Sequence, residues 1–257
     1  MAVLPMLTIA ALTSAIILLV VLVISKKTDL LLKTGKKEVL HSAILGFINP
    51  FAYYLILLKA YQLLPAQIAQ PLNMVWPIIL VFFSVLILGQ KIERKSFIAL
   101  FISFSGVFII SSQGNLFSPG HSDIRGVLLA LGSSVFWAFY FILNVKDKRD
   151  EAIKLFLNFL FGSIYLLIAI IVTDGWPSPS PGVKGTATAI YIGLFEMGIT
   201  FLFWLKALQT APSTDKISNL VYLAPFISLI FIHFILHEPV YYTTPAGLIL
   251  IVSGIWI

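Results

Sequence analysis

The chain has 257 residues, of which 59% are hydrophobic and 11% are charged, whereas soluble domains carry about 25% charged residues. This composition excludes a soluble protein and predicts an integral membrane protein whose spanning helices each need about 20 apolar residues. Cysteine is absent, which excludes disulfides and thiolate metal sites. The net charge of +6 would suit a nucleic acid, but its placement in loops accounts for it better, so we expect no nucleic-acid partner.

Apolar runs separated by polar breaks predict nine helices. The first run has no basic residue before it and is longer than the apolar core of a signal peptide, so it is predicted to be a retained span. The predicted helices cover residues 3–25, 40–61, 66–88, 97–112, 125–145, 153–173, 186–206, 216–236 and 241–257.

Lysine and arginine are unevenly distributed between alternate breaks. Fourteen of the 17 lie in the breaks after the first, third, fifth and seventh predicted helices, and only Lys59, Arg125 and Lys184 lie in the others. The positive-inside rule places the richer set in the cytoplasm. We therefore predict a bacterial inner (plasma) membrane protein whose amino terminus is outside and whose carboxyl terminus is cytoplasmic.

Two parts of the chain repeat each other. Equivalent helices are five positions apart in the order of predicted spans, and an odd number inverts the second copy, an arrangement typical of secondary transporters. We predict a first repeat at 1–112 and an inverted second repeat at 125–257. Gly46, Lys59, Ala60, Gln62 and Pro65 recur 147 positions later, and Pro77, Phe83, Leu88, Ser105 and Gly106 recur 148 positions later.

The second repeat begins near Arg125, so the first should begin about 22 residues before Met1. The opening helix of the first repeat is thus expected to be missing. Three explanations are open: the chain is a fragment, its start is assigned too late, or a span has been lost. The first two are favoured, because losing a helix would break the symmetry.

Several segments resemble the drug/metabolite transporter superfamily, in particular its EamA-type domain. They are LLALGSSVFWAFY from Leu128 to Tyr140, the KALQ segment, the mid-helix prolines, and the closing Ser-Gly pairs. The family usually has a Gly-Glu turn after the proline-bearing helix. The first repeat has only its glycine, in Gly89-Gln90, and the second has only its glutamate, in His237-Glu238. The resemblance implies an all-α polytopic membrane protein with ten helices in two inverted repeats, here about nine, and it implies transport without specifying the substrate.

Glu196 is the main candidate for substrate or proton binding. It lies in the middle of an apolar helix, where an ionised side chain must be protonated, paired or turned to water. The 147-residue offset places it on Asn49, and spacings of three and four put Thr200 and Tyr53 on the same faces. We predict that Glu196 and Asn49 meet across a pseudo-twofold axis. The alternative is a protonated glutamic acid bonded to a neighbouring helix.

Other polar and aromatic residues are predicted to line the cavity. The alternatives are aromatic belts at the membrane interface and proline kinks that do not move. Lys59 and Lys206 lie at helix ends and are expected to snorkel rather than bind anions. The predicted cavity residues are Ser133, Trp137, Tyr140, Gln70, Asn73, Trp76, Asn219 and Tyr222, with Pro77 and Pro225 as hinges.

These features favour a secondary transporter of small organic metabolites working by alternating access. An exporter of amino acids or related compounds, driven by a proton or by the substrate gradient, is the most specific version. The alternatives are a membrane enzyme acting on lipid-linked substrates and a non-transporting structural protein. The sequence lacks HExxH, GxSxG and nucleotide-binding GxxxxGK[ST] motifs, so we expect no enzyme activity, cofactor or metal. Gly247 and Gly254 would allow close helix contact, which is compatible with a homodimer but predicts no particular dimer.

Overall fold

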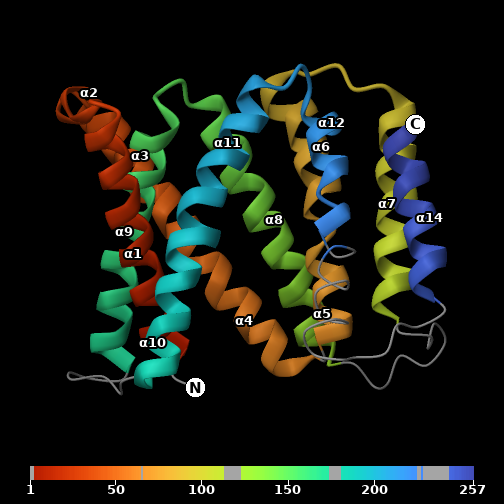
Figure 1. The fold of residues 1–257 in the computed structure, drawn as a ribbon, viewed down its shortest axis with the longest axis horizontal. Helices are drawn as coiled ribbons and strands as arrows, with labels where there is room; N and C mark the ends of the chain where they lie inside the picture. Colours follow the sequence, from red (N-terminus) through yellow and green to blue (C-terminus); the bar gives the residue numbers. More distant parts are fainter. Residues whose placement is uncertain (1–2, 65, 113–122, 174–180, 225–226, 228–242) are drawn as a thin grey trace. The chain divides into compact units, whose positions relative to one another are not determined.

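The computed structural model describes residues 3–64, 66–112, 123–173, 181–224, 227 and 243–257, and these residues are helical without any strand (Figure 1). Two segments, η1 and η2, are π-helical. The elements are α1 (Val3–Ile24), α2 (Thr28–Leu32), α3 (Lys36–Gly46), η1 (Phe47–Ala52), α4 (Tyr53–Leu63), α5 (Ala66–Asn73), α6 (Trp76–Leu88), α7 (Arg94–Ser111), α8 (Ile124–Lys146), α9 (Glu151–Thr173), α10 (Gly182–Tyr191), η2 (Ile192–Thr200), α11 (Phe201–Thr210), α12 (Thr214–Leu220) and α14 (Thr243–Trp256).

Five helical stretches among the described residues are long and apolar enough to cross a membrane. Their surfaces carry large apolar side chains such as Ile24, which is 75% exposed, and Val172, which is 78% exposed. Extended apolar surfaces of this kind need a lipid environment. The chain is therefore an all-α polytopic membrane protein, as predicted. The five stretches are Val3–Ile24, Lys36–Leu63, Ile124–Lys146, Glu151–Thr173 and Gly182–Thr210.

The predicted helix over 66–88 is divided in two. The α5 helix ends at Asn73, a turn follows at Met74 and Val75, and α6 begins at Trp76. Pro77 thus lies in the first turn of α6, where its missing N–H has no helical partner to lose. The break lies directly before Pro77, and the role of this proline as a hinge stays a prediction.

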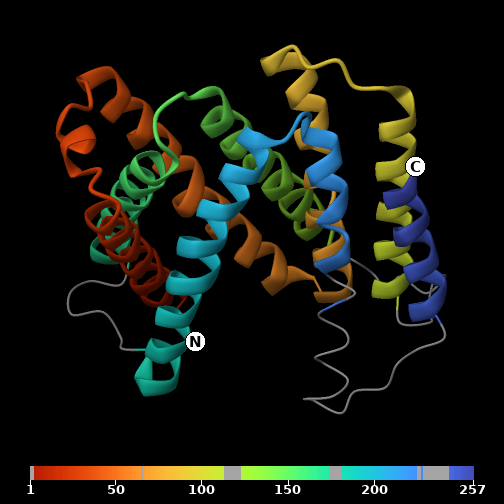
Figure 2. The ribbon, with the colours of Figure 1, turned by 45° about the horizontal axis from the view of Figure 1, so that its top comes forward.

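The described helices form two compact units that cut across the sequence repeats. Unit 1 combines Met1–Leu55 with Leu143–Gln209, and unit 2 combines Ile56–Ile142 with Thr210–Ile257. In unit 1, α1 packs against α9, α10 and η2, while α9 packs against α3 and η1; Figures 1 and 2 show α1 and α9 side by side. Leu22 near the end of α1 packs on Ala152 near the beginning of α9, so these two helices run antiparallel.

Two glycines of unit 1 make the same contact in the two repeats. A Cβ added to Gly46 in α3 would collide with the backbone carbonyl of Asn158 in α9, and one added to Gly193 in η2 would collide with that of Ala10 in α1. Gly193 follows Gly46 by 147 positions, and Asn158 follows Ala10 by 148. The repeats therefore exchange equivalent contacts, as an approximate twofold axis requires.

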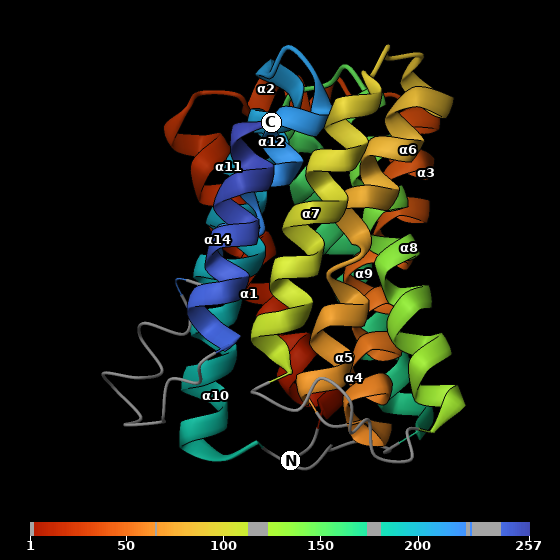
Figure 3. The same cartoon turned by 90° about the vertical axis from the view of Figure 1, so that its right-hand side faces the viewer.

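Unit 2 shows the same relationship between α7 and α14, which lie side by side (Figures 1 and 3). A Cβ added to Gly106 in α7 would collide with the carbonyl of Gly247, and one added to Gly254 in α14 would approach that of Ala99 to 2.6 Å. Gly254 and Gly247 follow Gly106 and Ala99 by 148 positions, and the crossed pairing makes the helices antiparallel. The inverted repeats are thus confirmed within each unit, and Gly247 and Gly254 serve contacts inside the chain.

Candidate functional site

The two π-helical segments of unit 1 occupy equivalent positions of the sequence repeat. Subtracting 147 from the bounds of η2 gives 45–53, which encloses η1 at 47–52. A π-helical turn closes an i→i+5 hydrogen bond, is rare, and occurs frequently at functional sites. Asn49 lies in η1 and Glu196 in η2. The two polar residues that the repeat aligns therefore share an irregular backbone environment.

Asn49 interrupts its helix and is completely buried. Its backbone is extended, with φ −150° and ψ 123°, and its side chain is 0% exposed. Among the described residues, neither its amide nitrogen nor its amide oxygen has a hydrogen-bond partner. A buried polar group left unsatisfied costs about 1–3 kcal/mol, so this amide is available to water or to a ligand.

Glu196 accepts a hydrogen bond from a residue that the sequence did not single out. The hydroxyl of Tyr54 donates to Oε1 of Glu196 at 3.1 Å, and the ring of Tyr53 packs edge-on against that of Tyr54 with centroids 4.9 Å apart. The Glu196 and Thr200 side chains are exposed. No hydrogen bond joins Glu196 to Asn49 in the described part of unit 1.

Helical periodicity explains why Tyr54 was missed. Counting four residues from Asn49 along an α-helical face selects Tyr53. The extended backbone of Asn49 breaks this helical phase, and the residue that reaches Glu196 is Tyr54, five positions on.

A second cluster lies in unit 2 and joins residues predicted on different helices. Nδ2 of Asn73 in α5 donates to Oγ of Ser133 in α8 at 2.9 Å, and Ser133 donates to the carbonyl of Ala130 at 2.6 Å. Nearby, the rings of Trp76 and Trp137 lie 5.9 Å apart. Four of the predicted cavity residues thus meet, and their role in binding stays a prediction.

The remaining candidates are dispersed within unit 2. Gln70 is half-buried in α5, Tyr140 is fully buried with its ring 5.1 Å from that of Phe141, and Nδ2 of Asn219 donates to the carbonyl of Gly254 at 2.7 Å. Tyr222 is fully buried in an apolar cluster. Pro225 lies outside the described residues.

A buried lysine is the main feature of unit 1 that the sequence did not reveal. The positive-inside argument placed Lys154 in a cytoplasmic break, but its side chain is 0% exposed in the first turn of α9. Its Nζ donates to the carbonyls of Asn144 and Asp147, both at 2.9 Å. With its amide turned to suit both neighbours, Gln209 accepts from Lys154 at 2.6 Å and donates to Glu151 at 2.7 Å. Gln209, the glutamine of the KALQ segment, is therefore a hydrogen-bond partner of Lys154.

The loop between α8 and α9 carries an ionic cluster beside that lysine. Arg149 donates to Asp147 at 2.5 Å and to Oγ of Ser42 at 2.9 Å, and Nδ1 of His41 lies 3.3 Å from Asp147. Burial alone would raise the pKa of Asp147, but the hydrogen bonds and the charge of Arg149 outweigh it, so this pKa lies below its ordinary value of 3.8. The cluster ties this loop to α3.

The described residues contain no group of three or more histidine, cysteine, aspartate or glutamate side chains that could hold a metal ion. The ionisable side chains of unit 1 are instead Glu196 beside a tyrosine hydroxyl, Lys154 among carbonyl and amide groups, and the ionic cluster around Asp147. Together with antiparallel equivalent helices, they define the class of inverted-repeat membrane proteins to which secondary transporters belong.

Comparison with known proteins gives the family. Residues 1–112 and 124–257 match the EamA-like transporter family, and the chain belongs to that family. It is similar to an uncharacterized transporter, YvbV of Bacillus subtilis (strain 168), with 29% identity over 93% of this chain and 77% of the relative. An uncharacterized transporter of Archaeoglobus fulgidus is 29% identical over 67% of this chain and 60% of the relative.

A solved crystal structure supports the fold alone. It superimposes with a TM-score of 0.84 over 99% of this chain and 88% of that chain, at 16% identity. The family match and these relatives support a general role as a transporter. Neither relative has an assigned substrate in its name.

Proposed function

We propose that the chain forms a secondary transporter of small organic metabolites, working by alternating access as an exporter of amino acids or related compounds. In this proposal, Glu196 binds either a proton or the ammonium group of the substrate. The membrane is the bacterial inner membrane, with the carboxyl terminus cytoplasmic. The substrate is a small molecule, and transport requires no cofactor.

The hydrogen bond from Tyr54 to Glu196 carries the proposal. A carboxyl group within a membrane-spanning helix is expensive unless it has a partner or contact with water, and such groups are usually functional. Here the Tyr54 hydroxyl supplies one polar partner for Glu196, and the exposed Glu196 side chain leaves room for a second partner. Asn49 offers an unpartnered amide in the equivalent π-helical segment, which suits a zwitterionic or cationic ligand.

Counterflow in proteoliposomes tests this function. Liposomes are loaded with single metabolites from a panel of amino acids, amines and sugars, and uptake of the labelled compound is followed. We expect saturable counterflow for at least one amino compound. Glu196→Gln should abolish counterflow or its pH dependence, whereas Phe195→Leu, a control at a neighbouring exposed position, should retain both.

The rival proposal is an enzyme acting on lipid-linked substrates. It predicts chemical turnover of a lipid substrate in the same liposomes and no saturable movement of solutes. If Glu196→Gln kept full transport activity and the same pH dependence, the proposed coupling role of Glu196 would be wrong. The proposal that the chain is a transporter would still stand.

A further inference from the structure

Unit 1 contains a pocket of about 340 Å³ between the beginning of α3 and the end of α8. Its size falls within the range of about 300–1,000 Å³ typical of small-molecule sites. The two helix ends lie at the same end of unit 1 (Figure 1), and the hydrogen bond from Arg149, just after α8, to Ser42 of α3 holds them together. The pocket is lined by Lys37, Glu38, His41, Leu143, Lys146 and Asp147.

Both carboxylates of the pocket already accept hydrogen bonds from the chain. Oε2 of Glu38 accepts from the backbone N–H of Gly35 at 2.7 Å. Oδ1 and Oδ2 of Asp147 accept from Nε of Arg149 at 3.1 and 3.0 Å, and the guanidinium balances the charge of this carboxylate. These carboxylates are therefore bound to donors of the chain before any ligand arrives.

The two lysines of the pocket are its unpaired charges. Lys37 and Lys146 are both exposed, and no ion pair joins either of them to a carboxylate in the described part of the chain. Ammonium groups without carboxylate partners are suited to a phosphate. The pocket therefore favours an anion over a cation.

The helix ends at the pocket favour the same sign of charge. The α3 helix begins at Lys36, so the positive end of its dipole lies at the pocket. The end of α8 would repel an anion, but the buried ammonium group of Lys154 donates to the carbonyls of Asn144 and Asp147, both at 2.9 Å. These bonds offset the partial negative charge at the end of α8.

An exposed apolar stripe runs from the pocket along the span Lys36–Leu63. Leu40, Ile44 and Phe47 are 62%, 52% and 49% exposed, and spacings of three and four place them with Lys37 on one face. A helix rises about 1.5 Å per residue, so the stripe from Lys37 to Phe47 is about 15 Å long. This is about half the thickness of the hydrocarbon core, which is the depth that one acyl chain occupies.

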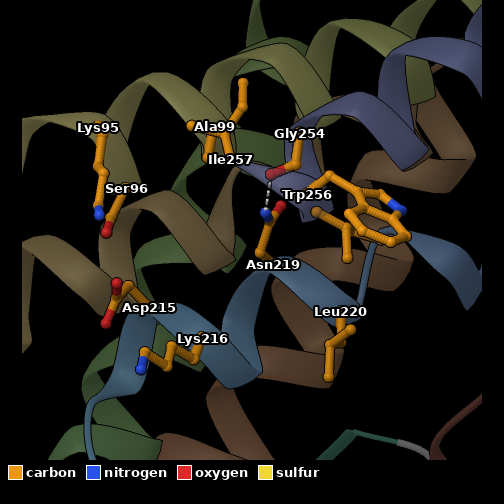
Figure 4. Close-up of a pocket in the computed structure, with 11 residues that line it drawn as sticks. Lys95, Ser96, Ala99, Asp215, Lys216, Asn219, Leu220, Gly254, Trp256 and Ile257 are labelled. Atoms are coloured by element: carbon orange, nitrogen blue, oxygen red, sulfur yellow. Dashed lines mark hydrogen bonds between the residues drawn. The ribbon is translucent and has the colours of Figure 1, made fainter.

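A pocket in unit 2 also contains lysines but differs in its pairing (Figure 4). Its carboxylate, Asp215, accepts hydrogen bonds from the side chains of Ser96 and Ser213, and Lys95 pairs with Glu93 at 3.0 Å. Figure 4 shows Lys95 and Asp215 on the same side of that pocket. The pocket of unit 1, by contrast, has two lysines that form no ion pair among the described residues.

We propose that the pocket of unit 1 binds one anionic phospholipid whose headgroup carries a phosphate and no ammonium group, such as phosphatidylglycerol. The phosphate lies between Lys37 and Lys146, and an acyl chain follows Leu40, Ile44 and Phe47. The order of headgroup and acyl chain in the lipid thus matches the order of charged and apolar residues along α3. A headgroup with its own ammonium group would bring a further cation beside the two lysines.

Native mass spectrometry of the purified full chain tests this site. The chain in detergent is titrated with phosphatidylglycerol, phosphatidylethanolamine and phosphatidylcholine of identical acyl chains. We expect one phosphatidylglycerol per chain to bind at least about tenfold tighter than either zwitterionic lipid, because each lysine near an anionic headgroup contributes about fivefold. Equally tight binding of either zwitterionic lipid would overturn the proposal.

Two double variants separate the pocket from the general charge of the loops. Lys37→Gln, Lys146→Gln should reduce the preference for phosphatidylglycerol to near unity. Lys33→Gln, Lys148→Gln removes the same charge from exposed lysines nearby in the sequence but outside the pocket, and it should keep the preference. Equal losses in the two variants would show that the net charge of the loops binds the lipid, and would refute the site.

Free glycerophosphoglycerol distinguishes a lipid site from a site for a soluble phosphate ester. If the pocket takes lipid, this headgroup without acyl chains should compete only weakly, because it lacks the contacts with the apolar stripe. Competition at the same concentration as the intact lipid would contradict the assignment to lipid. This measurement uses the unaltered chain and so does not depend on the folding of any variant.

Discussion

The hydroxyl of Tyr54 donates to Oε1 of Glu196 across 3.1 Å and thereby joins a helix of the first sequence repeat to a helix of the second. Both residues lie in unit 1, so the contact belongs to one packed body. A hydrogen bond to an ionised group contributes about 1.5–3 kcal/mol.

We expect Tyr54→Phe to lower metabolite counterflow by roughly tenfold, because Glu196 loses its polar partner while the ring is retained. Tyr191→Phe is the control, since it removes a hydroxyl from an exposed tyrosine of the same unit and should leave the rate within about twofold. Equal effects of the two substitutions would argue against a specific role for the hydrogen bond to Glu196.

Lys154→Met should destabilise the chain strongly. The methionine fills a similar volume but leaves two backbone carbonyls and the Gln209 amide without their donor, and breaking a buried polar network costs about 3–5 kcal/mol. The melting temperature in detergent should fall by several degrees. Lys148→Met, in the exposed part of the same loop, should leave it nearly unchanged, and similar melting temperatures for both variants would disprove the buried role.

The glycine contacts predict similar losses of stability when equivalent glycines of the two repeats are replaced. Gly46→Ala and Gly193→Ala each force a Cβ onto a backbone carbonyl, and overpacking typically costs about 1–3 kcal/mol. Both should lower the melting temperature by a similar amount. Gly132→Ala has open space around its Cβ and should be neutral or stabilising. A large cost at one glycine of the pair alone would count against the equivalence.

The Asp147 cluster predicts loss of stability in acid. A carboxyl group whose pKa is lowered by folding adds stability above its ordinary value of 3.8, and this contribution disappears as the pH falls through the lowered pKa. Asp147→Asn should lower the melting temperature at pH 7 and reduce the further loss between pH 4 and pH 3. Asp29→Asn, at an exposed carboxylate, is the control. A variant that keeps the full acid sensitivity would exclude Asp147 as its source.

Orientation can be tested with single cysteines, because the chain contains none. Lys148→Cys should react with an impermeant maleimide only after the cells are opened, whereas Lys184→Cys should react in intact cells. Both positions are exposed. The reverse pattern would place the carboxyl terminus outside.

Helix positions were predictable because the length and apolarity of a span are local properties of the sequence. The equivalence of Asn49 and Glu196 was also predictable, since a constant offset needs no structure. The contact of Tyr54 with Glu196 was not predictable, because periodicity arguments assume a continuous helix of 3.6 residues per turn, and the backbone at Asn49 is not helical. Burial of Lys154 depends on Gln209, which is distant from it in sequence, and on the carbonyls of Asn144 and Asp147 at the end of α8 and just after it. Periodicity along a single helix brings none of these groups to Lys154.

The reciprocal contacts of Gly46 with Asn158 and of Gly193 with Ala10 bear on ancestry. Each repeat completes its packing on helices supplied by the other, so a half-length precursor could have formed these contacts only with a sister molecule inserted upside down. Gene fusion would then have made permanent a pairing that first depended on inserting the same polypeptide in both directions.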